Sequence, residues 1–165
     1  MRGVTANGWL VEGGRVAGLA TDAGPLRARW TVNAGGAWAG QLPGLPFPLP
    51  VHPVKGQLVH LKPARMPVHV LQAGTLYLVP RAREGRVILG ATVEEEGYDA
   101  RTTAGGVRLL LEGGIRLFPA LAGAALIETR AGRRPGTPDG IPILGRTPLD
   151  GHLLAAGPFR KGILL

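Results

Sequence analysis

The sequence predicts an α+β fold in which an antiparallel sheet carries one main helix. Three observations lead to this prediction. Short segments of alternating residues recur along the chain, turns rich in glycine or proline separate them, and one longer segment has the apolar spacing of a helix. The chain has 165 residues, of which 45% are apolar, and this is enough for an ordinary core and argues against disorder.

The N-terminal part of the chain predicts strands and a bend. Residues 9–20 (WLVEGGRVAGLA) indicate two strands joined by a two-residue turn at Gly13–Gly14. Residues 26–32 alternate like another strand, which leads into a bend of small residues at 33–36. A bend of this kind lets backbone amides approach a ligand closely.

The middle of the chain predicts an antiparallel sheet that follows a stiff connector. Residues 42–50 are dense in proline, so we expect an extended segment there and a domain boundary near residue 45. Strands are then indicated at 56–61, 75–81 and 85–92, and a polar turn joins the last two.

One helix is predicted, over residues 103–117. Its apolar residues recur at three- and four-residue spacings and form one apolar face. Either of two threonines at its start can cap it, and Pro119 ends it. Two more strands are indicated at 124–130 and 152–156.

The segment AGRRPGTPDGIPILGR, residues 131–146, contains the strongest candidate for anion binding. Prolines on both sides of its Gly-Thr pair force turns, which can hold Arg134 rigidly. A planar guanidinium matches a carboxylate with two parallel hydrogen bonds. The alternative is an arginine that pairs with Asp139 or Glu128 on a surface turn.

Composition and motifs exclude several kinds of site. The chain has no cysteine, so it has no disulfide, thiolate metal site or cysteine nucleophile. The histidines lack metal-ligand spacing, the run Glu94–Glu95–Glu96 indicates a solvated turn, and we predict no metal site. The motifs GxSxG, GxxxxGK[ST] and GxGxxG are absent, so the chain has neither a hydrolase nucleophile nor a self-contained phosphate loop.

Charge and hydropathy restrict the classes of partner that this chain is expected to bind. The net charge is +8, but the basic residues are spread along the chain with few aromatic side chains beside them, which argues against nucleic acid. No apolar run reaches the length of a membrane helix, and the N-terminus lacks the pattern of a signal peptide. We therefore expect a cytoplasmic protein that does not bind membranes.

Five blocks of the sequence, taken in order, resemble the FAD-dependent D-amino-acid oxidase superfamily, and within it most of all the glycine oxidase branch of thiamine biosynthesis. The blocks are VNAGGAWAG, PVKGQLV, YLVPRAREGRVILGAT, ETRAGRRPGTPDGIPILGR and AAGPFRKGILL. The resemblance implies a substrate-binding antiparallel sheet domain at residues 45–139. It also implies partial remnants of a FAD-binding, Rossmann-like layer at 1–44 and 140–165.

The resemblance implies roles for individual residues. Tyr77 and Arg134 match the residues that hold the substrate carboxylate, and Arg160 matches a second arginine of the pocket. Val4 matches a residue whose main chain meets the adenine, and the loop from Pro158 matches one that lines the flavin ring. The complete set of residues expected to bind FAD is Val4, Ala34, Gly35, Gly56, Pro158, Phe159, Arg160, Lys161, Gly162, Ile163 and Leu164.

The implied reaction is oxidation of the CH–NH2 group of a small amino acid by hydride transfer to FAD, with molecular oxygen as the acceptor. Two departures from the family pattern are visible. Arg130 and Arg133 replace a tryptophan and a leucine, and Pro158 and Lys161 differ from the usual residues of the last block.

We expect this chain to begin after the family's GxGxxG motif and to stop before its closing helix. Alone, it should therefore bind FAD weakly and turn over little.

Three alternatives remain open at this point. The chain could belong to a sarcosine oxidase or dehydrogenase, or to a FAD oxidase domain that modifies tRNA. It could also be a non-catalytic fragment, such as an interaction module that pairs with a separately encoded nucleotide domain. The sequence leaves open whether homo-oligomers form.

Overall fold

The computed structural model describes residues 2–159. The chain divides into two compact units, which are described separately. Unit 1 consists of residues 1–53 and 134–165, and unit 2 consists of residues 54–133. The assignment of a substrate-binding part to residues 45–139 and of nucleotide-binding parts to the flanking segments stays a prediction.

The first sheet of unit 1 is an antiparallel hairpin with a short third strand. It comprises β1 (Ala6–Glu12), β2 (Arg15–Thr21) and β3 (Leu26–Arg27), in that order. Gly13 and Gly14 join β1 to β2, and both have positive φ, as a two-residue hairpin turn demands. The predicted hairpin is therefore confirmed.

The second sheet of unit 1 contains a parallel pair. Its order is β10 (Ile143–Arg146), β11 (His152–Ala156) and β4 (Thr31–Asn33), with β4 parallel to β11. The single strand predicted over 26–32 is wrong, because its first residues pair with β2 as β3 and its last residues join β11 as β4. That this sheet is a remnant of a Rossmann-like layer stays a prediction.

The core of unit 1 lies beneath the hairpin. Trp9, Val16 and Leu149 are buried there, and half-buried apolar residues of the predicted connector, including Leu42 and Phe47, pack against them. The connector, residues 42–50, contains no helix or strand, as its prolines predicted.

Unit 2 is built on a five-stranded sheet with the strand order β6-β7-β8-β5-β9. The pairs β6/β7, β7/β8 and β8/β5 are antiparallel, which confirms the predicted sheet. The strands are β5 (His52–Lys62), β6 (Leu71–Ala73), β7 (Leu76–Arg81), β8 (Arg86–Gly90) and β9 (Ala125–Gly136).

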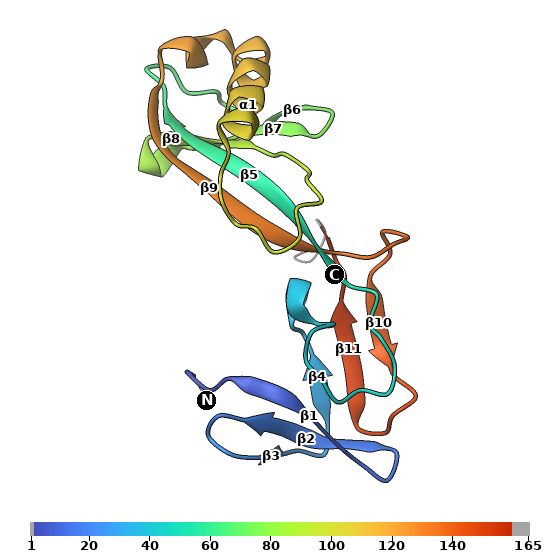
Figure 1. The fold of residues 1–165 in the computed structure, drawn as a ribbon. Helices are drawn as coiled ribbons and strands as arrows, with labels where there is room; N and C mark the ends of the chain where they lie inside the picture. Colours follow the sequence, from blue (N-terminus) through green and yellow to red (C-terminus); the bar gives the residue numbers. More distant parts are fainter. Residues whose placement is uncertain (1, 160–165) are drawn as a thin grey trace. The chain divides into compact units, whose positions relative to one another are not determined.

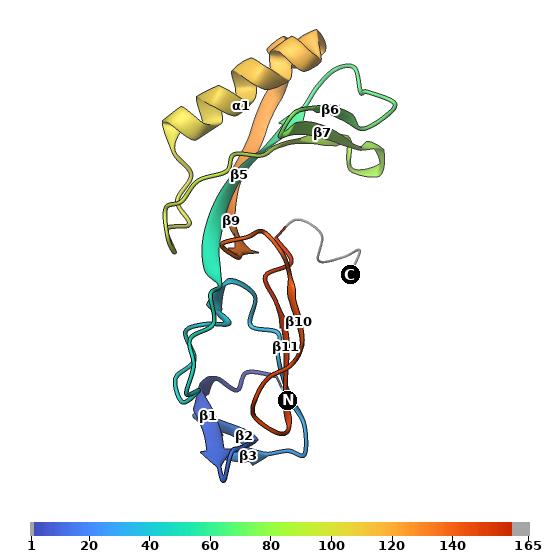
Figure 2. The ribbon, with the colours of Figure 1, turned by 90° about the vertical axis from the view of Figure 1, so that its right-hand side faces the viewer.

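One helix, α1 (Ala104–Leu117), lies across one face of this sheet (Figures 1 and 2). The Thr103 hydroxyl accepts a hydrogen bond from Gly106 N at 3.1 Å, so this residue is the N-cap. Leu110 inserts into the core between helix and sheet. The predicted helix is confirmed, and α+β is the fold class. The buried residues of this core are Val59, Leu61, Leu78, Val87, Leu89, Leu110 and Leu121.

Between residues 2 and 159, no helix has the length and hydropathy that a membrane span requires.

Candidate functional site

Four of the residues predicted to bind the cofactor lie at one edge of the β10-β11-β4 sheet. Because β4 and β11 run parallel, their carboxyl ends meet at the same edge. Ala34 and Gly35 follow β4, and Pro158 and Phe159 come shortly after β11. Ligands of open parallel sheets bind outside the carboxyl ends of the strands.

The bend after β4 is fixed by a side chain that the sequence analysis did not single out. Asn33 is buried; its Nδ2 donates to Ala39 O at 2.9 Å, and its Oδ1 accepts from Gly35 N at 3.1 Å. Ala34 and Gly35 remain exposed. An asparagine that begins a run of small residues is a turn signal, and it could have been used to find this residue.

The backbone that follows β11 is also fixed. Its contact with the end of β9 places Arg134 at the same edge of the sheet. Gly157 has φ +70°, and a Cβ on it would lie 2.4 Å from Thr137 Cγ2, so no side chain fits there. Phe159 N donates to Pro135 O at 2.9 Å, which ties the segment after β11 to the end of β9. The guanidinium carbon of Arg134 lies 6.0 Å from the centre of the Phe159 ring.

The expectation that turns hold Arg134 is wrong. Arg134 is half-buried and lies within β9, which runs on to Gly136, and the turn begins only at Pro138. The fixed φ of Pro135 is compatible with extended backbone, so this proline does not interrupt the strand. The alternative partners are engaged elsewhere: Asp139 accepts from Ile141 N at 3.0 Å, and Glu128 accepts from Arg130 Nε at 2.9 Å.

In unit 2, Tyr77 lies across a glycine of the neighbouring strand. Tyr77 on β7 is directly opposite Gly90 on β8. A Cβ on Gly90 would lie 2.9 Å from both Cζ and Oη of Tyr77, so the phenol rests on the bare Gly90 backbone. Leu78 and Leu89 pack toward α1, and neighbouring residues of a strand point to opposite faces. Tyr77 and Gly90 therefore face away from the helix.

Gly90 was not among the residues predicted for the site from the sequence. A glycine inside a strand pattern is the available signal, because it marks a close approach of another group to the backbone.

The other predicted residues fall in three places. Gly56 is buried in β5, two residues from Leu58, which is opposite Gly90, so Gly56 belongs to the face that carries Tyr77. Val4 precedes β1 and so lies beside the other sheet of unit 1. Five residues lie outside the described part of the chain, namely Arg160, Lys161, Gly162, Ile163 and Leu164. The joint action of Tyr77 and Arg134 stays a prediction, because the two residues belong to different units.

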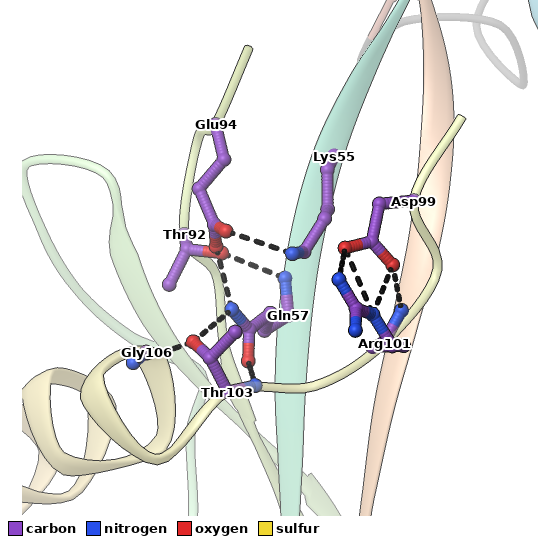
Figure 3. A network of polar contacts seen from close by, with 8 residues as sticks. All are labelled: Lys55, Gln57, Thr92, Glu94, Asp99, Arg101, Thr103 and Gly106. Atoms are coloured by element: carbon purple, nitrogen blue, oxygen red, sulfur yellow. Dashed lines mark hydrogen bonds and ion pairs between the residues drawn. The ribbon is translucent and has the colours of Figure 1, made fainter. Parts of the chain in front are cut away.

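Glu94 is not part of a solvated turn, and in this respect the prediction for the acidic run is wrong. Its carboxylate lies 3.1 Å from Nζ of Lys55, whose side chain is only 1% exposed (Figure 3). Glu95 and Glu96 are exposed, as expected. A buried ammonium group needs a charged partner, and Glu94 is the residue that supplies it.

Comparison with known proteins gives a consistent result. The family model described as FAD dependent oxidoreductase (DAO) matches residues 2–165. The glycine oxidase of Pseudomonas putida is 41% identical over 96% of this chain and 44% of its own length. The bifunctional protein ThiO/ThiG of Nostoc sp. is 43% identical over 99% of this chain and 25% of its own length.

The fold agrees with the sequence match. The crystal structure of glycine oxidase from Geobacillus kaustophilus superposes with a TM-score of 0.88 at 34% identity, over 98% of this chain and 44% of that one. The chain thus spans less than half the length of the glycine oxidases that it matches.

Proposed function

The chain belongs to the FAD dependent oxidoreductase family, and on this basis we propose that it supplies the amino-acid-binding part of a glycine oxidase-like enzyme. The reaction proposed is oxidation of the CH–NH2 group of a small amino acid, with molecular oxygen as the acceptor. The single observation that supports it most is the 41% identity to a glycine oxidase over 96% of this chain.

The carboxyl edge of β4 and β11 fits the cofactor. Asn33 holds the bend so that the backbone of Ala34 and Gly35 stays exposed, and the space at Gly157 admits no side chain. We propose that this edge holds FAD together with Pro158, Phe159 and the residues that follow. We propose contacts with FAD also for Val4 and Gly56, from the family resemblance alone. When bound, FAD supplies the acceptor for the hydride that leaves the substrate α-carbon.

Arg134 is proposed to bind the substrate carboxylate. A guanidinium can donate two parallel hydrogen bonds to a carboxylate, which fixes the direction of the α-carbon as well as its position. The Phe159 ring, 6.0 Å from the guanidinium carbon, limits where the side chain can lie. A positive charge near the substrate amine also favours its neutral form, which is the form that can be oxidised.

Tyr77 is proposed to donate a hydrogen bond from its phenolic hydroxyl to the carboxylate of the substrate. The end of its ring and its hydroxyl lie against the backbone of Gly90 on the neighbouring strand. Arg160 is proposed as a further cation of the substrate pocket, from the family resemblance alone. No covalent bond to the protein is required, so the proposed work of these side chains is positioning.

The experiment uses the holoenzyme, defined here as the FAD-loaded enzyme that contains this chain. The holoenzyme is prepared in one of two ways. Either the natural enzyme that contains this chain is used, or a chimera is made in which this chain replaces the matching segment of the Pseudomonas putida glycine oxidase. Peroxide is measured with glycine and with sarcosine. Peroxide from glycine supports the proposal, activity with sarcosine alone moves the chain to the N-methylamine oxidases, and activity with neither contradicts an oxidase function.

A second function, as an interaction module for a separate nucleotide-binding polypeptide, is favoured by one face of the β10-β11-β4 sheet. Trp30, Val32 and Leu144 are about half exposed on this face, at 45%, 54% and 58%. All-parallel sheets are normally covered on both faces, and this sheet contains one parallel pair, β4 and β11. The test is to mix the chain with the part of the Pseudomonas putida glycine oxidase that it does not match. A yellow complex that Val32→Glu disrupts supports this function, and two separate species in solution contradict it.

A further inference from the structure

Strand β9 forms one edge of the five-stranded sheet of unit 2. It stands last in the strand order, next to β5, and pairs with no further strand among residues 2–159 (Figure 1). An edge strand presents a row of backbone N–H and C=O groups with which another chain can pair. Soluble proteins often protect such an edge by keeping it short, but β9 extends over 12 residues. The sheet therefore has a long edge that a further strand could extend.

Apolar side chains are exposed on the first part of this edge. Leu126 is 56% exposed and Ile127 is 47% exposed. Small residues occupy the other end of the same stretch, where Ala131 is half-buried and Gly132 is exposed. A Cβ on Gly132 would meet no atom within 4 Å, so the space beside its backbone is open. Large apolar side chains and open space thus lie at opposite ends of one short stretch.

Two opposite charges flank the centre of this stretch. Glu128 precedes Thr129 and Arg130 follows it, and the Arg130 side chain is 61% exposed. Arg130 Nε donates to Glu128 Oε2 at 2.9 Å. This hydrogen bond is the largest of the causes that lower the pKa of Glu128, so the carboxylate is ionised at neutral pH. The stretch LIETRAG, residues 126–132, therefore carries an acid on one side of Thr129 and a base on the other.

The stretch is complementary to a second copy of itself that runs in the opposite direction. If Thr129 lies opposite Thr129 of the second copy, residues at equal distances from it also lie opposite each other. Glu128 then faces the second copy's Arg130, and Leu126 faces its Gly132, where the open space admits the leucine side chain. A two-fold axis repeats each of these pairs. Opposite charges directly across an antiparallel pair stabilise it.

Charge also selects this register over the neighbouring ones. If the axis moved by one residue toward the N-terminus, Glu128 would lie opposite Glu128 of the second copy. If it moved by one residue the other way, Arg130 would lie opposite Arg130. Like charges directly opposite each other destabilise a strand pair. The axis at Thr129 is therefore the register in which the charges match.

We propose that β9 is a dimer interface: two copies of this chain pair edge to edge, antiparallel about a two-fold axis at Thr129, and join their sheets into one. None of the residues that pair over 126–132 is assigned to cofactor or substrate. The proposal therefore stands or fails independently of the proposed function.

The first test uses disulfide formation in the full chain, which contains no cysteine of its own. Residues directly opposite in an antiparallel pair have Cα atoms about 4.5 to 5.5 Å apart, which a disulfide can bridge. Thr129→Cys should therefore give a linked dimer under mild oxidation, and a reducing agent should release it. Gly132→Cys is the matched control, because it would lie about 20 Å along the strand from its own counterpart.

The register is tested by mixing two variants. Leu126→Cys and Gly132→Cys should form a linked dimer together much faster than either variant does alone, because the two positions are opposite each other. If Thr129→Cys forms no disulfide, or if Gly132→Cys links to itself equally fast, the proposal is overturned. A strand from a different protein on this edge would likewise leave Thr129→Cys unlinked in the purified chain.

The second test is sedimentation velocity of the chain without introduced thiols. We expect a dimer whose Kd rises at least tenfold in Arg130→Glu, because an acidic side chain then lies opposite Glu128. Arg116→Glu makes the same change of charge at an exposed position of α1 and should leave the dimer intact. A chain that sediments as a monomer at every concentration, or equal effects of the two variants, would contradict the proposal. If Arg130→Glu does not fold, the thiol variants still decide the question.

Discussion

Replacement of Gly90 by alanine tests the geometry around Tyr77. The new Cβ would lie 2.3 Å from Leu58 Cδ2 and 2.9 Å from Cζ and Oη of Tyr77. Leu58 can move aside by rotating a flexible side chain, but the tyrosine ring is rigid and must tilt off the strand. Crowding of this kind costs about 1 to 3 kcal/mol, so the free energy of unfolding of unit 2 should fall by that amount.

Two assays follow the consequences of Gly90→Ala. Urea denaturation of the chain measures the loss of stability, and KM for glycine in the holoenzyme measures the displacement of the hydroxyl. Gly123→Ala is the control in the same unit, because a Cβ there meets no atom within 4 Å. If Gly90→Ala changes neither the urea midpoint nor KM, the phenol does not lie on Gly90.

Three further predictions concern unit 1. His152 is fully buried, and burial lowers its pKa from 6.5. Because the unfolded chain then binds the proton more readily, unit 1 should lose stability as the pH falls below 6.5. His152→Gln should flatten the profile of Tm against pH, and an unaltered profile would contradict this prediction. Arg134→Ala in the holoenzyme should raise KM for glycine by orders of magnitude, since loss of a paired charged contact costs about 2 to 5 kcal/mol, and an unchanged KM would remove Arg134 from the site. Gly157→Ala forces a Cβ to within 2.4 Å of Thr137 Cγ2 and should weaken FAD retention on gel filtration, whereas Gly132→Ala, with nothing within 4 Å, should retain the cofactor.

Local patterns predicted the elements whose contacts are local. The β1–β2 hairpin follows from Gly13–Gly14, and α1 follows from its apolar spacing and its N-cap threonine. The strand predicted at 152–156 coincides with β11. In each case the deciding residues lie within one turn or one strand of each other, so the sequence contains the information directly.

The errors arise where a partner distant in sequence decides the structure. The strand expected over 26–32 divides because β2 takes its first part and β11 takes its last. Glu94 was predicted to be solvated because it begins an acidic run. Its carboxylate instead pairs with Lys55, which precedes it by 39 residues (94 minus 55). Lys55 pairs with Glu94 one position out of register with Leu58 and Gly90, and periodicity cannot predict this shift because the paired residues are distant in sequence.

The residues of the candidate site also fall into two groups, those that the sequence predicted and those that only the folded chain revealed. The family blocks predicted Ala34, Gly35, Pro158 and Phe159 as residues that bind the cofactor, and the parallel pairing of β4 with β11 gathers them at one edge. The residues that fix their backbones, Asn33 among them, emerged only from the hydrogen bonds of the folded chain.

Anaerobic reduction of the flavin by glycine isolates the proposed oxidation of the amino acid from the later reaction with oxygen. Glycine is mixed with the holoenzyme in the absence of oxygen, and the visible absorbance of the flavin is followed. We predict that the yellow colour is lost with saturating dependence on glycine, and that Arg134→Ala shifts saturation to much higher concentration. Colour that persists with glycine and with every other small amino acid would contradict the proposed reaction.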